Sequence, residues 1–292
     1  ILFCTQGYID TLPELIEGVR EVVGPHPIIC GGTGDGVFET AGMRHNGVSA
    51  MGIAADGRAE FKAAIVKDLQ RDSFAAAREA ARKASAELTM PAALAFVMAD
   101  GLKADGSQLV AGIKQVLKVP FFGGLAADSR QFQRTVVFLN DVVAEDAVMV
   151  LAIGGEISFC LNAASGWHPT GELGRVTRVS GPVLFEINGQ PAATFLKEQT
   201  GKNIINMDLG IVSLAEYSDL AAGKFALRSP SRTDDASGQV TLFGSVAEGA
   251  SVRVCRTSVE SIIAGVRQAI AGVQSAGIKP RALVIISCAG RK

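Results

Sequence analysis

The spacing of apolar and polar positions divides the first part of the chain into short buried runs and amphipathic stretches. Apolar residues recur at helical spacing over residues 9–23 and predict an amphipathic helix there. A longer helix is expected over residues 58–88, which are rich in Ala, Lys, Arg and Glu, with a break near Asp72 and Ser73. A third helix is expected over residues 107–117. Short apolar runs predict strands over residues 1–5, 27–30, 92–98 and 119–122, and a loose alternation predicts another over residues 47–54.

A run of strands without intervening helices follows and predicts antiparallel pairing. Turn signals stand at Asn140 and Asp141, at Gly154 and Gly155, and at Asn188 and Gly189. The expected strands cover residues 135–139, 147–153, 157–162, 175–179 and 183–187.

The last third mixes both patterns. Pro191 opens a helix that we expect to end near Gln199, and residues 205–231 are weakly patterned. Two strands are expected over residues 239–246 and 251–255, and a final one over residues 282–287. Between them, Ser258 is the expected N-cap of a long helix over residues 259–275.

This order of elements predicts an α+β fold with layered mixed and antiparallel sheets, flanked by helices, in two structurally joined regions. We place the boundary at residue 203, so that the regions are 1–203 and 204–292.

Composition excludes several function classes. The net charge of −1 gives no electrostatic reason to expect binding to nucleic acid or to an anionic membrane. No segment approaches the ~20 apolar residues that span a bilayer. The chain opens without the basic residues of a signal peptide, and we expect it to be trimmed at both ends. The five cysteines are irregularly spaced, which predicts reduced thiols in a cytoplasmic protein and no zinc site.

Three short segments of glycine and aspartate each follow an expected strand. If these strands are neighbours, their turns converge at one edge of a sheet, where ligands commonly bind. Two interpretations stay open: the segments line a ligand, or they are tight turns in which aspartate caps the backbone. The candidate residues are Gly32, Thr33, Gly34, Asp100, Gly124 and Asp128.

Later segments add aromatic and charged candidates. Trp167, His168 and Thr170 form the best single candidate for a recognition loop, although a Trp that fills the core explains it equally well. Arg228 and Arg291 are candidates for binding a ligand carboxylate. Cys288 is a candidate nucleophile with His168 as its base, but a small buried thiol is the simpler reading.

The chain resembles the FIST sensory domain family. The resemblance rests on the order of motifs along nearly the whole chain, with residues 1–203 similar to the N-terminal FIST region and residues 204–292 similar to an incomplete C-terminal region. These motifs are CGGTGDG, ADG, FFGGLAADS, TVVFLND, GWHPTGELGRVTRVSG, LFEINGQPAATFL, FALRSP, GSVAEGASVRV and VIISCAGR. The family's first loop often reads GCSTAGE, whereas this chain has Asp35 as the acid there, so no role for Glu is carried over.

The resemblance implies a signal-input protein rather than an enzyme. Its ligand is expected to be an amino acid or a similar small polar metabolite, bound between the two regions, and its partner a signalling protein such as a histidine kinase. One branch of the family binds haem and senses nitric oxide, which makes haem on His168 the alternative. A cysteine-dependent enzyme that uses Cys288 ranks last, because no base is assignable from spacing.

Overall fold

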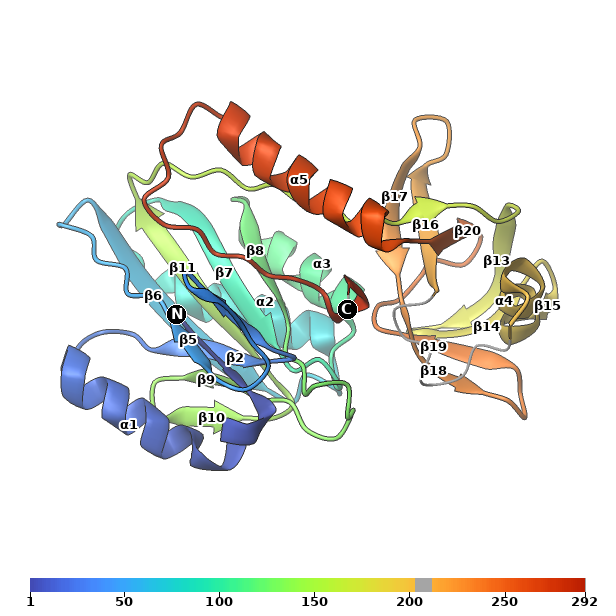
Figure 1. Cartoon of the computed structure of the whole chain (residues 1–292). Coiled ribbons are helices and arrows are strands. Elements are labelled where there is room, and N and C mark those ends of the chain that lie inside the picture. Colours follow the sequence, from blue (N-terminus) through green and yellow to red (C-terminus); the bar gives the residue numbers. More distant parts are fainter. Residues whose placement is uncertain (203–211, 292) are drawn as a thin grey trace. The chain divides into compact units, whose positions relative to one another are not determined.

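The computed structural model describes residues 1–202 and 212–291, which divide into two compact units (Figure 1). Unit 1 consists of Ile1–Ser158 with Leu283–Ala289, and unit 2 of Phe159–Ala282 with Gly290–Lys292. The expected α+β class, with mixed and antiparallel sheets flanked by helices in two regions, is confirmed. The expected boundary at residues 203 and 204 lies outside the described residues.

Unit 1 contains two sheets that pack face to face. Contacts of β2 with β7 and β11, and of β9 with β6 and β11, join the sheets. The first sheet has the order β10 (Val142–Ala144), β9 (Val137–Leu139), β2 (Cys30–Gly34), β1 (Leu2–Thr5) and β5 (Val48–Ala50). The second has the order β6 (Ala59–Lys67), β11 (Ala147–Gly155), β7 (Ala92–Ala99) and β8 (Phe121–Leu125). A small hairpin of β3 (Val37–Glu39) and β4 (Gly42–Arg44) completes the strands of this unit.

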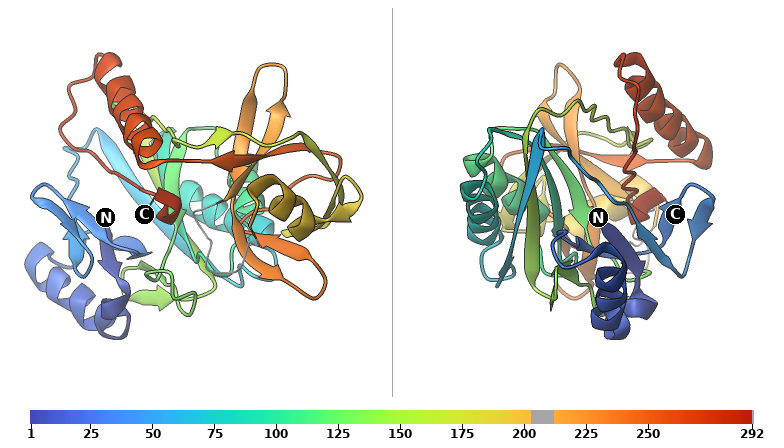
Figure 2. Two further views of the ribbon diagram at one scale, coloured as in Figure 1. Left: turned by 45° about the vertical axis from the view of Figure 1, so that its right-hand side comes forward. Right: turned by 90° about the vertical axis from the view of Figure 1, so that its left-hand side faces the viewer.

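Helices cover the two outer faces of this sandwich (Figure 2). Behind the second sheet lie α2 (Ser73–Ala86) and α3 (Gly106–Val116), and the buried face of α2 consists mainly of alanines, which allow close packing on the strands. The first sheet is covered by the short helix η1 (Gln6–Thr11) and by α1 (Leu12–Val23), whose Leu12 and Ile16 are fully buried. Unit 1 therefore has four layers, with a helical layer outside each sheet.

Glycine lets backbones approach closely inside this sandwich. A Cβ atom on Gly31 would lie 1.7 Å from the carbonyl oxygen of Leu2 on the neighbouring strand β1. A Cβ on Gly123 in β8 would lie 1.8 Å from the carbonyl oxygen of Val97 in β7. These glycines are strand positions that no larger residue can occupy without moving a strand.

Unit 2 is built on one large antiparallel sheet. Its order is β17 (Lys224–Arg228), β16 (Ser213–Asp219), β20 (Ser251–Arg256), β13 (Gly174–Ser180), β14 (Val183–Ile187), β19 (Gln239–Leu242) and β18 (Pro230–Asp234). Two short strands join its sides, β12 (His168–Pro169) on β20 and β15 (Gln190–Pro191) on β14. The helix α4 (Ala192–Thr200) buries Phe195 and Leu196 in the core of this sheet. The helix α5 (Val259–Ser275) follows β20, and the last short helix is η2 (Ala289–Arg291).

Several sequence predictions are wrong, each for a local physical reason. The expected helix over residues 58–88 is β6 followed by α2, because the Ala- and Lys-rich stretch 59–67 pairs along its length with β11. Tertiary pairing outweighs intrinsic propensity there. The break expected near Asp72 is confirmed, since its side chain accepts a hydrogen bond from Ala75 N and caps α2.

Several strand ends were also predicted wrongly, because glycines were interpreted as turn residues. The expected loop GGTGDG is largely strand β2, and Gly123 and Gly124 lie inside β8 rather than in a turn. Gly154 and Gly155 end β11 instead of forming a hairpin turn. Residues 157–162 and 282–287 form no strand. In the weakly patterned stretch 205–231, the described residues form β16, β17 and the start of β18.

Candidate functional site

The carboxyl ends of three strands of unit 1 meet at one edge of the sandwich. Ala126, just after β8, donates its N–H to Ala99 O at the end of β7, with a distance of 2.7 Å. The next residue, Ala127, donates to Thr33 O in β2 at 3.0 Å. The expected convergence of the three segments therefore occurs, at the kind of strand edge where ligands often bind.

Asp100 uses its carboxylate to hold this edge together. The side chain is 1% exposed and accepts hydrogen bonds from Leu102 N at 2.9 Å and from Asp146 N at 2.7 Å. The hydroxyl of Thr135 also donates to it. These bonds join three chain segments and leave the carboxylate enclosed by donors of the protein itself.

Asp128 does the same for the following loop. Its carboxylate accepts hydrogen bonds from the backbone N–H groups of Phe132, Gln133 and Arg134 at distances of 2.6 to 3.0 Å. In the loop that it closes, Ser129, Arg130 and Phe132 all have positive φ angles, of 59°, 63° and 54°. Non-glycine residues rarely adopt this conformation, and such strain often marks a functional loop.

Two residues of opposite charge, Asp35 and Arg130, have bonding partners in or next to that loop. Asp35 follows β2 and accepts a hydrogen bond from Ser129 N at 2.7 Å, which places its carboxylate next to the residue that precedes Arg130. The half-buried guanidinium of Arg130 donates from Nη2 to Ala289 O at 2.5 Å. We call Asp35, Ser129, Arg130 and Ala289 the strand-end cluster. It offers a carboxylate and a guanidinium on adjoining loops, the pair of groups that a zwitterion requires.

Other predicted residues of unit 1 lie in or beside this edge. Thr33 is 1% exposed, and its hydroxyl accepts a hydrogen bond from Val136 N at 3.3 Å, so it joins β2 to the stretch before β9. Gly32 lies under Met98, Gly34 ends β2, and Gly124 lies against Ile286. Cys288 is exposed, so its interpretation as a buried thiol is wrong, and it precedes Ala289 of the cluster.

The predicted recognition loop of unit 2 has a buried and an exposed side. Trp167 is 7% exposed and packs with Ala215 and Cys255. His168 is exposed and pairs through its backbone with Arg256, and Thr170 is exposed with its N–H bonded to Val254 O at 2.8 Å. The indole therefore fills a small core, while the two polar side chains face outwards.

The two predicted carboxylate-binding arginines of unit 2 have partners of their own. Arg228 forms an ion pair with Glu216 at 2.6 Å, and the side chains are 22% and 15% exposed. Glu216 also accepts a hydrogen bond from Ala247 N at 2.9 Å, so the pair anchors the turn before β20. Arg291 donates from Nη2 to Ala164 O.

Sequence reasoning missed Asp35 and Arg130 as site residues. Asp35 stands in the CGGTGDG motif but was considered only as the acid of that loop, and Arg130 directly follows the FFGGLAADS motif. The signal that identifies them is tertiary, because residues 35, 130 and 289 come together only in the folded unit.

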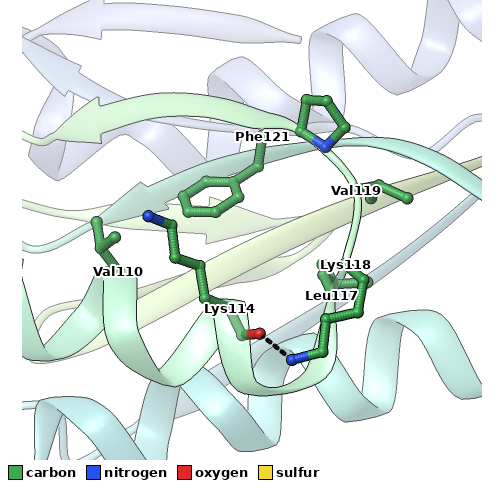
Figure 3. Close-up of a pocket in the computed structure, with 7 residues that line it drawn as sticks. Val110, Lys114, Leu117, Lys118, Val119 and Phe121 are labelled. Atoms are coloured by element: carbon green, nitrogen blue, oxygen red, sulfur yellow. Dashed lines mark hydrogen bonds between the residues drawn. The ribbon is translucent and has the colours of Figure 1, made fainter.

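A shallow groove of about 700 Å³ on unit 1 contains none of the predicted residues. It lies between the end of α3 and the start of β8 and is lined mostly by apolar side chains such as Val110, Leu117 and Phe121 (Figure 3). Lys118 Nζ donates to Lys114 O at 2.7 Å and so satisfies a carbonyl at the end of α3.

Burial strongly affects two thiols of the first sheet of unit 1. It raises the pKa of Cys4 and of Cys30 to about 11, since a thiolate is poorly solvated there. No disulfide joins any of the five cysteines, all of which lie among the described residues.

Within residues 1–202 and 212–291, no helix has the length and apolarity needed to cross a membrane.

Two family models match the chain and together cover its whole length. A model of the FIST N domain matches residues 1–190, and a model of the FIST C domain matches residues 189–292. The chain belongs to the FIST family. FIST domains are sensory domains that bind small ligands in signal transduction.

The comparison also covers an archaeal relative and the solved structures. Protein MJ1623 of Methanocaldococcus jannaschii is 28% identical over 137 residues, which cover 47% of this chain and 27% of that protein. The chain thus matches about a quarter of the length of that relative. No solved structure matches the chain significantly.

Proposed function

We propose that this FIST protein senses an amino acid or a similar small polar metabolite through the strand-end cluster of unit 1. The observation that carries the proposal is the hydrogen bond of 2.7 Å between Ser129 N and Asp35, which holds a carboxylate against the residue that precedes Arg130. The guanidinium would bind the ligand carboxylate in bidentate fashion, and Asp35 would accept hydrogen bonds from its ammonium group.

Specificity follows from requiring both charges at once. A site that hydrogen-bonds two polar groups rejects analogues that lack either of them, because its own partly buried groups then lose a partner. We therefore expect amino acids to bind more tightly than the amines or the hydroxy acids of the same side chain.

Thermal-shift and calorimetric titration with these three ligand series tests the proposal. A ligand at 100 times its Kd stabilises the folded state by about 2.7 kcal/mol, which is readily measured. Arg130→Gln should abolish binding of amino acids and hydroxy acids alike, whereas Asp35→Asn should remove mainly the preference for the ammonium group. The exposed residues Arg71 and Asp56 give matched controls, Arg71→Gln and Asp56→Asn, that should bind as the wild type does. Unchanged affinity in Arg130→Gln would refute this assignment of the site.

We also propose that the protein acts by binding rather than by catalysis. In its support, the two buried carboxylates at this edge, Asp100 and Asp128, hold loops in place by accepting backbone hydrogen bonds.

A cytoplasmic location is proposed because the cysteines carry no disulfide. A signalling protein such as a histidine kinase is the proposed reader of the bound state.

Haem on His168 fits the described residues poorly. A haem site needs an apolar wall beside the axial ligand. The adjacent apolar residue, Trp167, is buried with Ala215 and Cys255, whereas the His168 imidazole is exposed to solvent.

A further inference from the structure

The outer face of α5 carries a stripe of exposed branched apolar side chains. Val259, Ile263, Val266 and Ile270 are 69%, 45%, 39% and 48% exposed. They follow one another at spacings of four, three and four residues, so they lie on one side of the helix. We call these four residues the α5 seam. Four exposed β-branched residues in one stripe form a patch that soluble proteins usually cover.

A different face attaches α5 to unit 2. Gly265 is the buried residue of this helix, and a Cβ there would lie 2.9 Å from Gly166 N. Nearby, Asn162 Nδ2 donates to Ala269 O at 3.1 Å. Gly265 lies about 100° or more around the helix from each seam residue, because each residue advances the helix by about 100°. The seam is therefore not needed for the packing of α5 on its own unit.

The spacing of the seam is that of a coiled coil. Alternating steps of four and three residues give the repeat of 3.5 residues that keeps one stripe facing a second helix. In heptad terms Ile263 and Ile270 occupy a positions, and Val259 and Val266 occupy d positions. Apolar side chains at both the a and the d positions allow this stripe to pack against a second helix with the same pattern.

Charged residues beside the seam select the direction of pairing. Glu260 and Arg267 occupy successive e positions, whereas the g positions hold the apolar residues Ile262 and Ala269. Two antiparallel copies place e opposite e, so Glu260 of each copy meets Arg267 of the other, twice by symmetry. Two parallel copies place e opposite g and form no charge pair. Hydrogen bonds from its own backbone N–H and from Ser258 hold the pKa of Glu260 below its usual value, so it is ionised at neutral pH.

We propose that α5 pairs antiparallel with α5 of a second copy of this chain through the α5 seam. The pairing is self-complementary in shape and charge, as a two-fold contact requires. A helix of 17 residues buries an area at the low end of specific interfaces, so the dimer should form reversibly with concentration. This inference is independent of the ligand proposed for unit 1.

Analytical ultracentrifugation of the full chain, from micromolar to submillimolar concentration, tests the pairing. The wild type should pass from monomer to dimer, and Ile263→Glu should remain monomeric throughout, because it places charge in the apolar seam. Val142→Glu adds the same charge at an apolar side chain that is 44% exposed in unit 1, and it should dimerise as the wild type does. Circular dichroism confirms that each variant is folded.

Charge reversal tests the direction. Glu260→Arg and Arg267→Glu should each weaken the dimer roughly tenfold, and the double variant should restore it. A wild type that is monomeric at every concentration overturns the proposal, as does a dimer that survives Ile263→Glu. A dimer that ignores both charge reversals overturns the antiparallel arrangement.

Discussion

At the scale of single residues, the buried carboxylates of unit 1 hold loops together through hydrogen bonds within the protein. Asp100 accepts hydrogen bonds from residues that follow β7 and precede β11, and Asp128 closes the strained loop that carries Arg130. In the sequence, both aspartates were open to two interpretations, as ligand-binding groups or as caps of turns. Their partners are what distinguishes the two roles, and sequence spacing does not reveal partners.

Replacing Asp100 with Asn should cost stability rather than affinity. The amide retains one acceptor oxygen and turns an N–H group toward backbone donors, so we expect the free energy of unfolding to fall by roughly 2–4 kcal/mol. Urea denaturation measures this loss, and the exposed Asp56→Asn should stay within about 0.5 kcal/mol of the wild type. An Asp100→Asn protein of normal stability that fails to bind ligand would instead assign the carboxylate to the ligand.

At the scale of elements, the sequence pattern predicts capped helices and short turns more accurately than strands that contain glycine. The helix over residues 259–275 and its N-cap Ser258 are confirmed, because capping and periodicity are local properties. The strand over residues 183–187 and the turn at Asn188 and Gly189 are confirmed for the same reason. β2 and β8 were misread because their glycines serve contacts with β1 and β7, which are distant in sequence. The strand-end cluster was missed for the same reason, because its residues come from segments that are distant in the sequence.

The glycines of two helices should respond in opposite ways to the same substitution. Gly18 of α1 has no atom within 4 Å of an added Cβ, so Gly18→Ala should stabilise the protein by about 0.5–1 kcal/mol through helix propensity. Gly265→Ala gains the same propensity but pushes α5 away from Gly166, and we expect a net loss of about 1–3 kcal/mol. Thermal and urea unfolding of the pair measure both changes. Equal stabilisation by the two substitutions would show that α5 is not tightly packed on residues 165 and 166.

At the scale of the whole molecule, the chain returns from unit 2 to unit 1 shortly before its last residues. Leu283–Ala289 belongs to unit 1, although it follows α5 of unit 2. Ile286 lies against Gly124 in β8, and Ala289 O accepts the hydrogen bond from Arg130. The segment is weakly buried, with Leu283 and Ile285 58% and 56% exposed, so it contributes more to the local order of the strand-end cluster than to the core.

Removing residues 283–292 should therefore loosen one edge of unit 1 and leave the rest intact. Hydrogen exchange is expected to accelerate over β8 and residues 128–134, because local opening there no longer breaks contacts with the returning segment. Exchange in α1, whose Leu12 and Ile16 are buried elsewhere in the unit, should not change. Arg130→Gln, which removes only the bond to Ala289, should give a smaller effect in the same region. If exchange accelerated equally in α1, the segment would be part of the global core, and the strand-end cluster would not depend on it selectively.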